Sequence, residues 1–491
     1  MKTISHLVLI AFLLILISTK TSAQELYNEP YRPQYHFSPA KGWIGDPCGF
    51  IHYQNKFHMF WWGKVTSEDL VYYKEDSPKV MTGDDGTIAY FTGSVLVDKN
   101  NTAGFGENSL IAAYTIFNHK TKNQSQGISY SDDGKVFQYY SGNPVLDIGS
   151  TEFRDPTVIW HEPTSKWIMV VAMALEKKIK FYSSSDLKSW IWISDFGPAG
   201  AQEKAWECPD MFQLPVDGDP TNKKWVMVVS IDWAREQYFI GDFDGTTFRL
   251  DSKHSTEPLY VDHGLDYYAS RTFQDYDYTL KTVTSMGWIA TWDYAPIVPT
   301  SWGKGFWSIP RDLELKTFPE GVRMIQKPIA NLQKLRQTPL TYTIKLKKGT
   351  NTLAKFSPTE NVYEMDAVFS TEKHNTFGFN LCVGDGRKVS FSYDTKSELL
   401  TIDRTNTSNI PIEKFPRTTS AKVTSINKQI RMHFFVDKSS IELFTNDGKE
   451  VFTLLTYPGE SQTGIETFSE NGNTKMELKV WTLKSIWKKI N

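Results

Sequence analysis

Three acidic residues lie in short motifs that place a proline close to the acid. Asp46 stands in the segment WIGDPCGF, Asp155 in FRDPTV and Glu207 in WECPD. Two carboxyl groups about 5–5.5 Å apart can cleave a glycosidic bond with retention, because one attacks the anomeric carbon while the other protonates the leaving group. The motifs therefore indicate sugar chemistry if the fold brings these acids together.

The local sequence predicts different tasks for the three acids. Asp46 lies in a turn between Gly45 and Gly49, where we expect backbone N–H groups to hold the carboxylate ionised as a nucleophile. Glu207 has a tryptophan and a cysteine beside it, and such apolar neighbours favour the protonated carboxyl of a general acid and base. Asp155 follows an arginine, so we expect it to stay ionised and accept hydrogen bonds from sugar hydroxyls.

The sequence contains an internal repeat that could bring the three acids together in the fold. The strings KWIMVV at 166–171 and KWVMVV at 224–229 lie 58 residues apart, and a looser copy, KFHMFW, covers 56–61. Each string is typical of a short buried strand. A second element, a turn-like motif with a shared aspartate, recurs every 53 to 64 residues at Asp69, Asp133, Asp186 and Asp244.

Repeats of this length without helical periodicity between about 35 and 325 predict a β-propeller of five blades, the fifth being a weaker copy near 260–310. Each acid precedes or opens the first strand of a blade, and the innermost strands of all blades surround one channel. Asp46, Asp155 and Glu207 are therefore expected to meet at one end of that channel. The alternative is an ordinary all-β domain with chance repetition, but two element types that recur in step argue against it.

The N-terminus predicts export. Lys2, the apolar run 7–17 and the segment Thr21-Ser22-Ala23 have the layout of a secretory signal peptide, so we assign residues 1–23 to it and expect a periplasmic or extracellular protein. No segment reaches the length of a membrane span. With 54 basic and 56 acidic residues the formal net charge is −2, which argues against a nucleic-acid partner.

The cysteines favour no disulfide framework. There are three, Cys48, Cys208 and Cys382, an odd number with a spacing that fits no zinc site. We expect buried free thiols, with a strained disulfide between Cys48 and Cys208 as the alternative. No glycine-rich phosphate loop or metal-ligand cluster stands out, so neither a cofactor nor a metal is predicted.

The motifs together resemble glycoside hydrolase family 32, which comprises levanases, inulinases and invertases. The resemblance rests on HFSPAKGWIGDPCGF, FRDPTVIWHEPTSKW and WECPDMFQLPVDG, followed or interleaved by FTGSVLVD, QYFIGDFDGTTF, DHGLDYYAS and IPRDLEL. It runs from about residue 33 to 486 and implies an all-β chain, with a five-bladed β-propeller over 24–330 and a C-terminal β-sandwich over 331–491. The alternating segment 431–453, with a turn at 446–448, fits a sandwich hairpin.

The resemblance also implies roles for individual residues. Asp46 would be the nucleophile and Glu207 the acid and base, while Asp155 would bind fructosyl hydroxyls and stabilise the charged transition state. Seven further residues would bind substrate: Trp43, Trp62, Phe91, Ser94, Arg154, Tyr268 and Trp288. The implied activity is cleavage of β-D-fructofuranosidic bonds in fructans (levan or inulin) or fructo-oligosaccharides by a monomer.

The sequence departs from the family pattern around the proposed nucleophile. Gly45 and Cys48 stand where the family usually has asparagine, and the longer segment that usually follows Trp62 is missing before Ser67. These departures point away from sucrose and toward a fructan chain or an unusual linkage. Two alternatives stay open: a fructosyltransferase on the same fold, and a fructan-binding protein with impaired catalysis.

Overall fold

The computed structural model describes residues 27–77, 79–251, 257–275, 282–353 and 355–487. In this part of the chain nearly all regular structure is β, and the helical segments are the 3₁₀ turns η1 (Glu162–Thr164), η2 (Ala295–Ile297) and η3 (Ala330–Leu335). The predicted signal peptide, 1–23, lies outside the described residues. None of the helices described is long and apolar enough to cross a bilayer.

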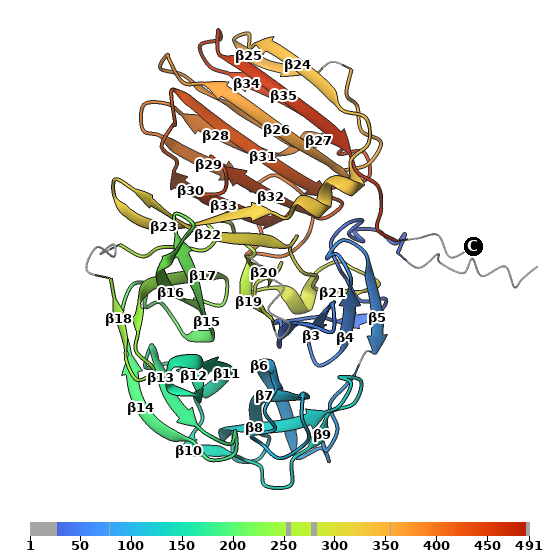
Figure 1. Ribbon diagram of the computed structural model, residues 1–491. Helices are drawn as coiled ribbons and strands as arrows, with labels where there is room; N and C mark the ends of the chain where they lie inside the picture. Colours follow the sequence, from blue (N-terminus) through green and yellow to red (C-terminus); the bar gives the residue numbers. More distant parts are fainter. Residues whose placement is uncertain (1–26, 78, 252–256, 276–281, 354, 488–491) are drawn as a thin grey trace, which may run out of the picture.

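The first and larger part of the chain is a five-bladed β-propeller, which confirms the predicted fold class (Figure 1). The first blade contains β2 (Phe50–Tyr53), β3 (Lys56–Phe60), β4 (Lys64–Ser67) and β5 (Tyr73–Ser77). The second contains β6 (Ile88–Asp98), β7 (Ser109–Asn118), β8 (Gln124–Ser131), β9 (Gln138–Tyr139) and β10 (Leu146–Ser150). The third contains β11 (Phe153–His161), β12 (Lys166–Met173), β13 (Lys178–Ser184) and β14 (Ile191–Phe196). The fourth contains β15 (Trp206–Val216), β16 (Asp219–Ile231), β17 (Arg235–Phe243) and β18 (Phe248–Leu250). The fifth contains β19 (Tyr268–Asp275), β20 (Val283–Trp288), β22 (Arg311–Phe318) and β23 (Gly321–Pro328).

The repeated strings found in the sequence are the second strands of their blades. KWIMVV lies in β12, where every residue after the lysine is buried, and KWVMVV lies in β16. The shared aspartates form the turns that follow: Asp186 accepts backbone hydrogen bonds from Lys188 and Ser189, and Asp69 does the same with the two residues at 71 and 72. Such side-chain-to-backbone turns explain why aspartate recurs at this place in the repeat.

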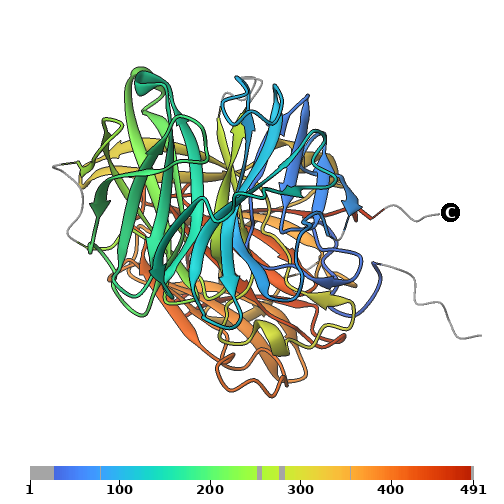
Figure 2. The ribbon, with the colours of Figure 1, turned by 90° about the horizontal axis from the view of Figure 1, so that it is seen from below.

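Parallel strand contacts join three of the blades. In β2 and β19 Phe50 lies opposite Phe273, and their rings stack with centroids 4.9 Å apart. A second parallel contact joins β15 to β22. Strands of the fourth, fifth and first blades therefore belong to one 12-stranded sheet. Figure 2, turned by 90°, shows the blades from the side as strands packed around the axis.

The C-terminal part is a β-sandwich of two six-stranded sheets, as predicted. One sheet contains β24 (Leu340–Lys345), β35 (Lys475–Thr482), β26 (Tyr363–Ser370), β31 (Gln429–Asp437), β32 (Ser440–Thr445) and β33 (Glu450–Leu455). The other contains β25 (Gly349–Thr352), β34 (Gly464–Ser469), β27 (Thr376–Gly384), β28 (Arg387–Asp394), β29 (Leu399–Asp403) and β30 (Thr418–Lys422). The predicted turn at 446–448 joins β32 to β33, with all three residues in the left-handed region.

Buried ion pairs connect the sandwich to the propeller, and the sandwich lies beside the fifth blade (Figure 1). Arg311 of β22 binds Glu442 of β32 and Asp262, and none of these side chains is more than 1 % exposed. His36 contacts Asp437 at 2.7 Å and Glu442 at 2.8 Å through its two ring nitrogens. Charges removed from water in this way need such complete pairing, because each unpaired one would carry a large desolvation penalty.

Candidate active site

The three predicted acids line one pocket of about 870 Å³ where the inner strands of the blades converge. Asp46 lies between β1 (Gly42–Trp43), a short strand paired with β21 (Gly303–Lys304), and β2. Asp155 lies in β11 and Glu207 in β15. The first, third and fourth blades thus each supply one carboxyl group, as the repeat predicted.

A β-bulge recurs at the same place in four inner strands. Strand register shifts between residues 154 and 157 in β11, 207 and 210 in β15, 268 and 271 in β19, and 90 and 93 in β6. Asp155, Cys208 and Ala269 have left-handed backbones there, with φ of 66°, 48° and 53°. Bulges re-aim side chains next to functional sites, and the prolines at 156 and 209, which lack an N–H, fit only such an interruption of the ladder.

Asp46 is enclosed, and its two carboxyl oxygens differ. Oδ2 accepts a hydrogen bond from Thr92 Oγ1 at 2.9 Å and lies 3.8 Å from the Sγ of Cys208. Oδ1 is buried and has no hydrogen-bond partner among the described residues. Burial, followed by the nearby charges of Asp155 and Glu207, raises the pKa of Asp46 to about 7. This corrects the expectation of backbone N–H donors: a hydroxyl holds one carboxyl oxygen, and the other has no hydrogen-bond donor among the described residues.

Glu207 is held by polar partners rather than by apolar ones. Its carboxyl accepts a hydrogen bond from Arg154 Nε at 2.9 Å and a short one from the hydroxyl of Tyr268. The side chain remains 15 % exposed toward the pocket. The expected apolar enclosure is therefore wrong, because Trp206 packs into the core between the third and fourth blades and the Cys208 thiol faces the two aspartates.

Asp155 is the most deeply buried of the three acids, at 4 % exposure. Its Oδ2 accepts the backbone N–H of Cys208 at 3.1 Å. Burial, then the charge of Glu207, raises the pKa of Asp155 to about 6, while Arg154 opposes that rise. The guanidinium of Arg154 thus favours the ionised form of Asp155, against the effects of burial and of Glu207.

The cysteines are free and buried, as expected, and no disulfide joins Cys48 to Cys208. The Cys208 thiol lies 3.8 Å from an oxygen of Asp46 and 3.6 Å from one of Asp155. Burial is the main reason that the pKa values of both thiols lie well above their ordinary range. The thiols are therefore uncharged and serve as packing and weak donors beside the carboxylates.

The seven predicted substrate-binding residues lie in three different places. Four line the pocket: Trp43, Trp62, Phe91 and Arg154. Tyr268 and Trp288 are fully buried behind it, where Tyr268 contacts Glu207 and the Trp288 ring lies 5.8 Å from that of Trp43. Ser94 lies outside the pocket lining and accepts the backbone N–H of Val158 at 3.1 Å, which links the second blade to the third.

Several residues in and behind the pocket were not predicted from the sequence. The pocket lining also includes Thr92, Gln124, Glu152, Leu175, Trp233 and Trp292. Behind it lies Arg271, buried at 2 % exposure, which donates to Thr157 Oγ1 at 2.7 Å, to the carbonyl of Cys208 at 3.3 Å and to that of Pro209. A basic residue inside the apolar strand DYYASRTF was the available hint for Arg271.

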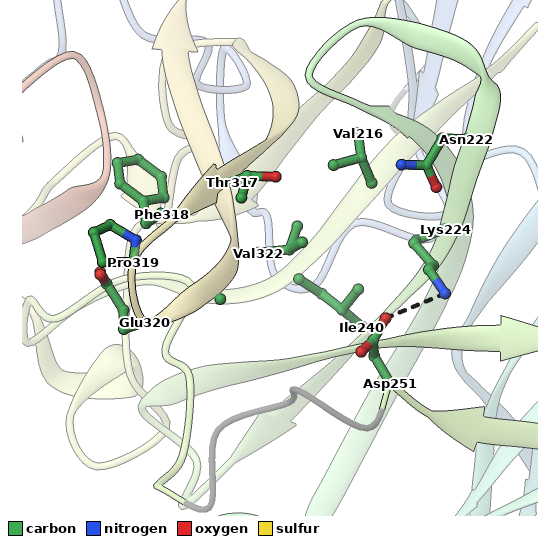
Figure 3. A pocket seen from close by; sticks show the side chains of 11 residues that line it. Val216, Asn222, Lys224, Ile240, Asp251, Thr317, Phe318, Pro319, Glu320 and Val322 are labelled. Carbon is green, nitrogen blue, oxygen red and sulfur yellow. Dashed lines mark ion pairs between the residues drawn. The ribbon is translucent and has the colours of Figure 1, made fainter.

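A second pocket, of about 540 Å³, lies between the fourth blade and the β22–β23 hairpin (Figure 3). Its two acids, Asp251 and Glu320, are paired with Lys224 at 3.1 Å and Lys449 at 2.5 Å. Neutralised in this way, they form no counterpart to the converging carboxyl groups of the larger pocket.

A propeller that brings three carboxyl groups into one pocket has the residue types that a glycosidase requires. The chain belongs to glycoside hydrolase family 32: the family's N-terminal domain model matches residues 36–328 and its C-terminal model residues 331–482. The chain is thus a glycoside hydrolase that acts on fructosides.

Similar proteins bear this out in sequence and in structure. The levanase of Bacillus subtilis is 37 % identical over 98 % of this chain and 75 % of its own length. The extracellular exo-inulinase of Aspergillus niger is 30 % identical over 94 % of this chain and 96 % of its own. The crystal structure of exo-inulinase from Aspergillus awamori, 29 % identical, superposes with a TM-score of 0.85 over 94 % of this chain and all of that one.

Proposed function

We propose that this chain is an exported, monomeric retaining hydrolase that cleaves β-D-fructofuranosidic bonds in levan, inulin or their oligosaccharides. The observation that supports the proposal is that Asp46 and Glu207 line the same pocket. One carboxyl oxygen of Asp46 has no hydrogen-bond partner among the described residues, and Arg154 holds the carboxyl group of Glu207. The relatives named as levanase and extracellular exo-inulinase support the substrate class and the export, and residues 1–23 would supply the signal peptide. The catalytic domain would comprise 24–330, with 331–491 as a bracing sandwich.

The site assigns each step to one side chain. The free Oδ1 of Asp46 attacks the anomeric carbon and forms a covalent fructosyl ester, while Glu207 gives its proton to the departing oxygen. Glu207 then removes a proton from water, and the resulting nucleophile releases fructose from Asp46. Asp155, ionised and fixed by Cys208 N–H, accepts hydrogen bonds from fructosyl hydroxyls and stabilises the positive charge that develops on the ring.

Product analysis tests this proposal. The purified protein is incubated with levan, inulin and sucrose, and products are separated by chromatography while NMR follows the anomer first released. Free fructose or an oligosaccharide ladder, with the β-anomer appearing first, is the expected result. Chains longer than the substrate would instead indicate a fructosyltransferase, and binding without any product a fructan-binding protein.

A further inference from the structure

Exposed tryptophans form one wall of the pocket. Trp43, Trp233 and Trp292 all line it with 39–40 % of their surfaces exposed, although large aromatic side chains are mostly buried elsewhere in the chain. The rings of Trp43 and Trp292 stack with centroids 5.7 Å apart and an interplanar angle of 28°. The second and third blades add polar and charged side chains to the lining, among them Gln124 and Arg154. The pocket therefore offers both flat aromatic surfaces and hydrogen-bonding groups.

The backbone that presents Trp233 is unusual. The residue lies in the turn between β16 and β17, where Asp232 and Trp233 both adopt left-handed conformations with φ of 58° and 60°. A bulky side chain rarely occupies this region, and such strain persists where the surrounding structure imposes it. Here the carbonyl of Trp233 accepts hydrogen bonds from Thr291 Oγ1 at 3.0 Å and from the backbone N–H of Trp292 at 3.1 Å.

A lysine fixes the ring as well. Lys204 Nζ lies 4.9 Å from the centroid of the Trp233 ring and 3.1 Å from Oδ1 of Asp232. A cation placed over an indole attracts it electrostatically, and the ion pair holds that cation in place. The Trp233 ring is therefore both exposed to the pocket and restrained in orientation, a combination that favours binding because little freedom is lost when a ligand stacks on it.

Strand register places Trp233 on the leaving-group side. Glu207 lies opposite Ser230 and Trp206 opposite Ile231 in the β15–β16 ladder, so the turn containing Trp233 projects from the end of the blade where Glu207 stands. The acid that protonates the departing oxygen must lie on the side of the departing sugars. The restrained ring of Trp233 and the adjoining Trp292 thus flank the path along which those sugars extend.

We propose that Trp233 and Trp292 form a stacking platform for leaving-group sugars beyond the first, which makes this enzyme select fructan chains over sucrose. The inference rests on the proposed function and names its substrate class. A flat indole excludes water from the apolar C–H face of a sugar ring, while the sugar hydroxyls remain free to bind the polar side chains of the pocket. Sucrose offers only one leaving sugar and so gains little from Trp233, whereas a longer fructan covers the whole platform.

The test compares kcat/KM for sucrose with that for fructan oligosaccharides of two to five fructose units. In the wild type kcat/KM rises with chain length. Trp233→Ala lowers kcat/KM for the longer oligosaccharides by about 10-fold, the effect of losing one well-stacked ring, and that for sucrose by much less. Trp233→Phe, which keeps a flat face, recovers most of the chain-length dependence.

A matched control exists on the third blade. Trp192 is also exposed, at 55 %, and also has a lysine over its ring, Lys180 at 5.9 Å, but it does not line the pocket. Trp192→Ala should leave kcat/KM unchanged for every substrate. Lys204→Met, which removes the restraint but keeps the ring, should reduce the chain-length dependence partially and provides a second variant if Trp233→Ala does not fold.

The outcomes separate this inference from the proposed function. If the wild type cleaves no fructoside, the proposed function fails before any variant is compared. If the wild type is active but Trp233→Ala and Lys204→Met lower kcat/KM equally for sucrose and for long oligosaccharides, or change neither, the platform is overturned while the proposed function stands.

Discussion

The indole nitrogen of Trp43 lies 2.8 Å from the point where a β-carbon on Gly45 would stand. The glycine therefore gives the Trp43 ring the space that a side chain at position 45 would occupy. The ring then stacks on Trp292 and joins the aromatic wall. Gly45, which stands where the family usually has asparagine, thus leaves room for an aromatic ring beside the proposed nucleophile, Asp46.

Gly45→Asn should move Trp43 and change substrate preference. Because the new β-carbon would clash with the indole, the exposed Trp43 side chain must turn away, and the aromatic wall loses one ring. We expect the ratio of kcat/KM for fructan oligosaccharides to that for sucrose to fall several-fold. Gly218→Asn, in a turn where a β-carbon meets nothing within 4 Å, is the control. An unchanged ratio in Gly45→Asn would refute the link between Gly45 and specificity.

Asp46→Asn and Glu207→Gln should each remove nearly all activity without loss of structure. Each change replaces a reacting oxygen with an amide of the same shape, so kcat should fall by about 10³-fold or more while the melting temperature stays close to that of the wild type. The control is Glu203→Gln, an exposed carboxyl just before β15, which should retain full kcat. Near-normal turnover in Glu207→Gln would overturn the assigned roles.

The pH dependence of kcat/KM should reflect the raised pKa of Asp46. The nucleophile must be ionised, so activity is present above a pKa of about 7 and lost as the pH falls through it. The positive charge of Arg271 lowers the pKa of Asp46, and Arg271→Met should therefore move the acid limb to higher pH. Asp155 raises the pKa of Asp46, so the residual activity of Asp155→Asn should show an acid limb at lower pH. Shifts in the same direction for both variants would contradict this electrostatic account.

Glu442→Gln should destabilise the junction between propeller and sandwich. Arg311 and His36 each contact two acidic side chains, and Glu442 is one of the two in both cases. The change therefore leaves each of these buried cationic groups with a single acidic partner. We expect a loss of about 3 kcal/mol in the free energy of unfolding, measured with urea at pH 7. Asp195→Asn, which breaks the more exposed ion pair with Lys180, should change it by no more than about 1 kcal/mol.

His36 should make stability depend on pH in the alkaline range. Burial alone would lower its pKa, but hydrogen bonds to Asp437 and Glu442 raise the pKa of His36 to about 9. The unfolded value is about 6.5, so this contribution is fully present below pH 6.5 and is lost as the pH rises through 9. Urea unfolding across this range should show that decline in the wild type. A His36→Gln variant should lack it, and an equal decline in both proteins would exclude His36 as the cause.

The propeller could be predicted because each blade repeats short local sequence patterns. Buried strings and turn aspartates recur in step, and the position of Asp46, Asp155 and Glu207 within that repeat was enough to place them in one pocket. What surrounds each acid could not be predicted in the same way. Thr92 reaches Asp46 from a neighbouring blade, and contacts between blades leave no trace in the spacing along the chain.

Two expectations about the surroundings of the acids failed. A tryptophan beside Glu207 suggested an apolar wall, but Glu207 lies in a bulged strand, where successive side chains do not follow simple alternation. Glycines beside Asp46 suggested exposed N–H donors, but the donor that reaches this carboxyl is the hydroxyl of Thr92. The prolines at 156 and 209 were the available clue to the bulges, since a central strand rarely accepts proline.

The parallel contact between β2 and β19 has a consequence for when this enzyme becomes active. Asp46 leaves the ribosome before the other two acids, yet the first strand of the blade it precedes pairs with a strand made more than two hundred residues later. Contacts that span so much chain form late and slowly. A nascent or truncated polypeptide that ends before β19 would therefore contain all three acids and still lack a competent centre.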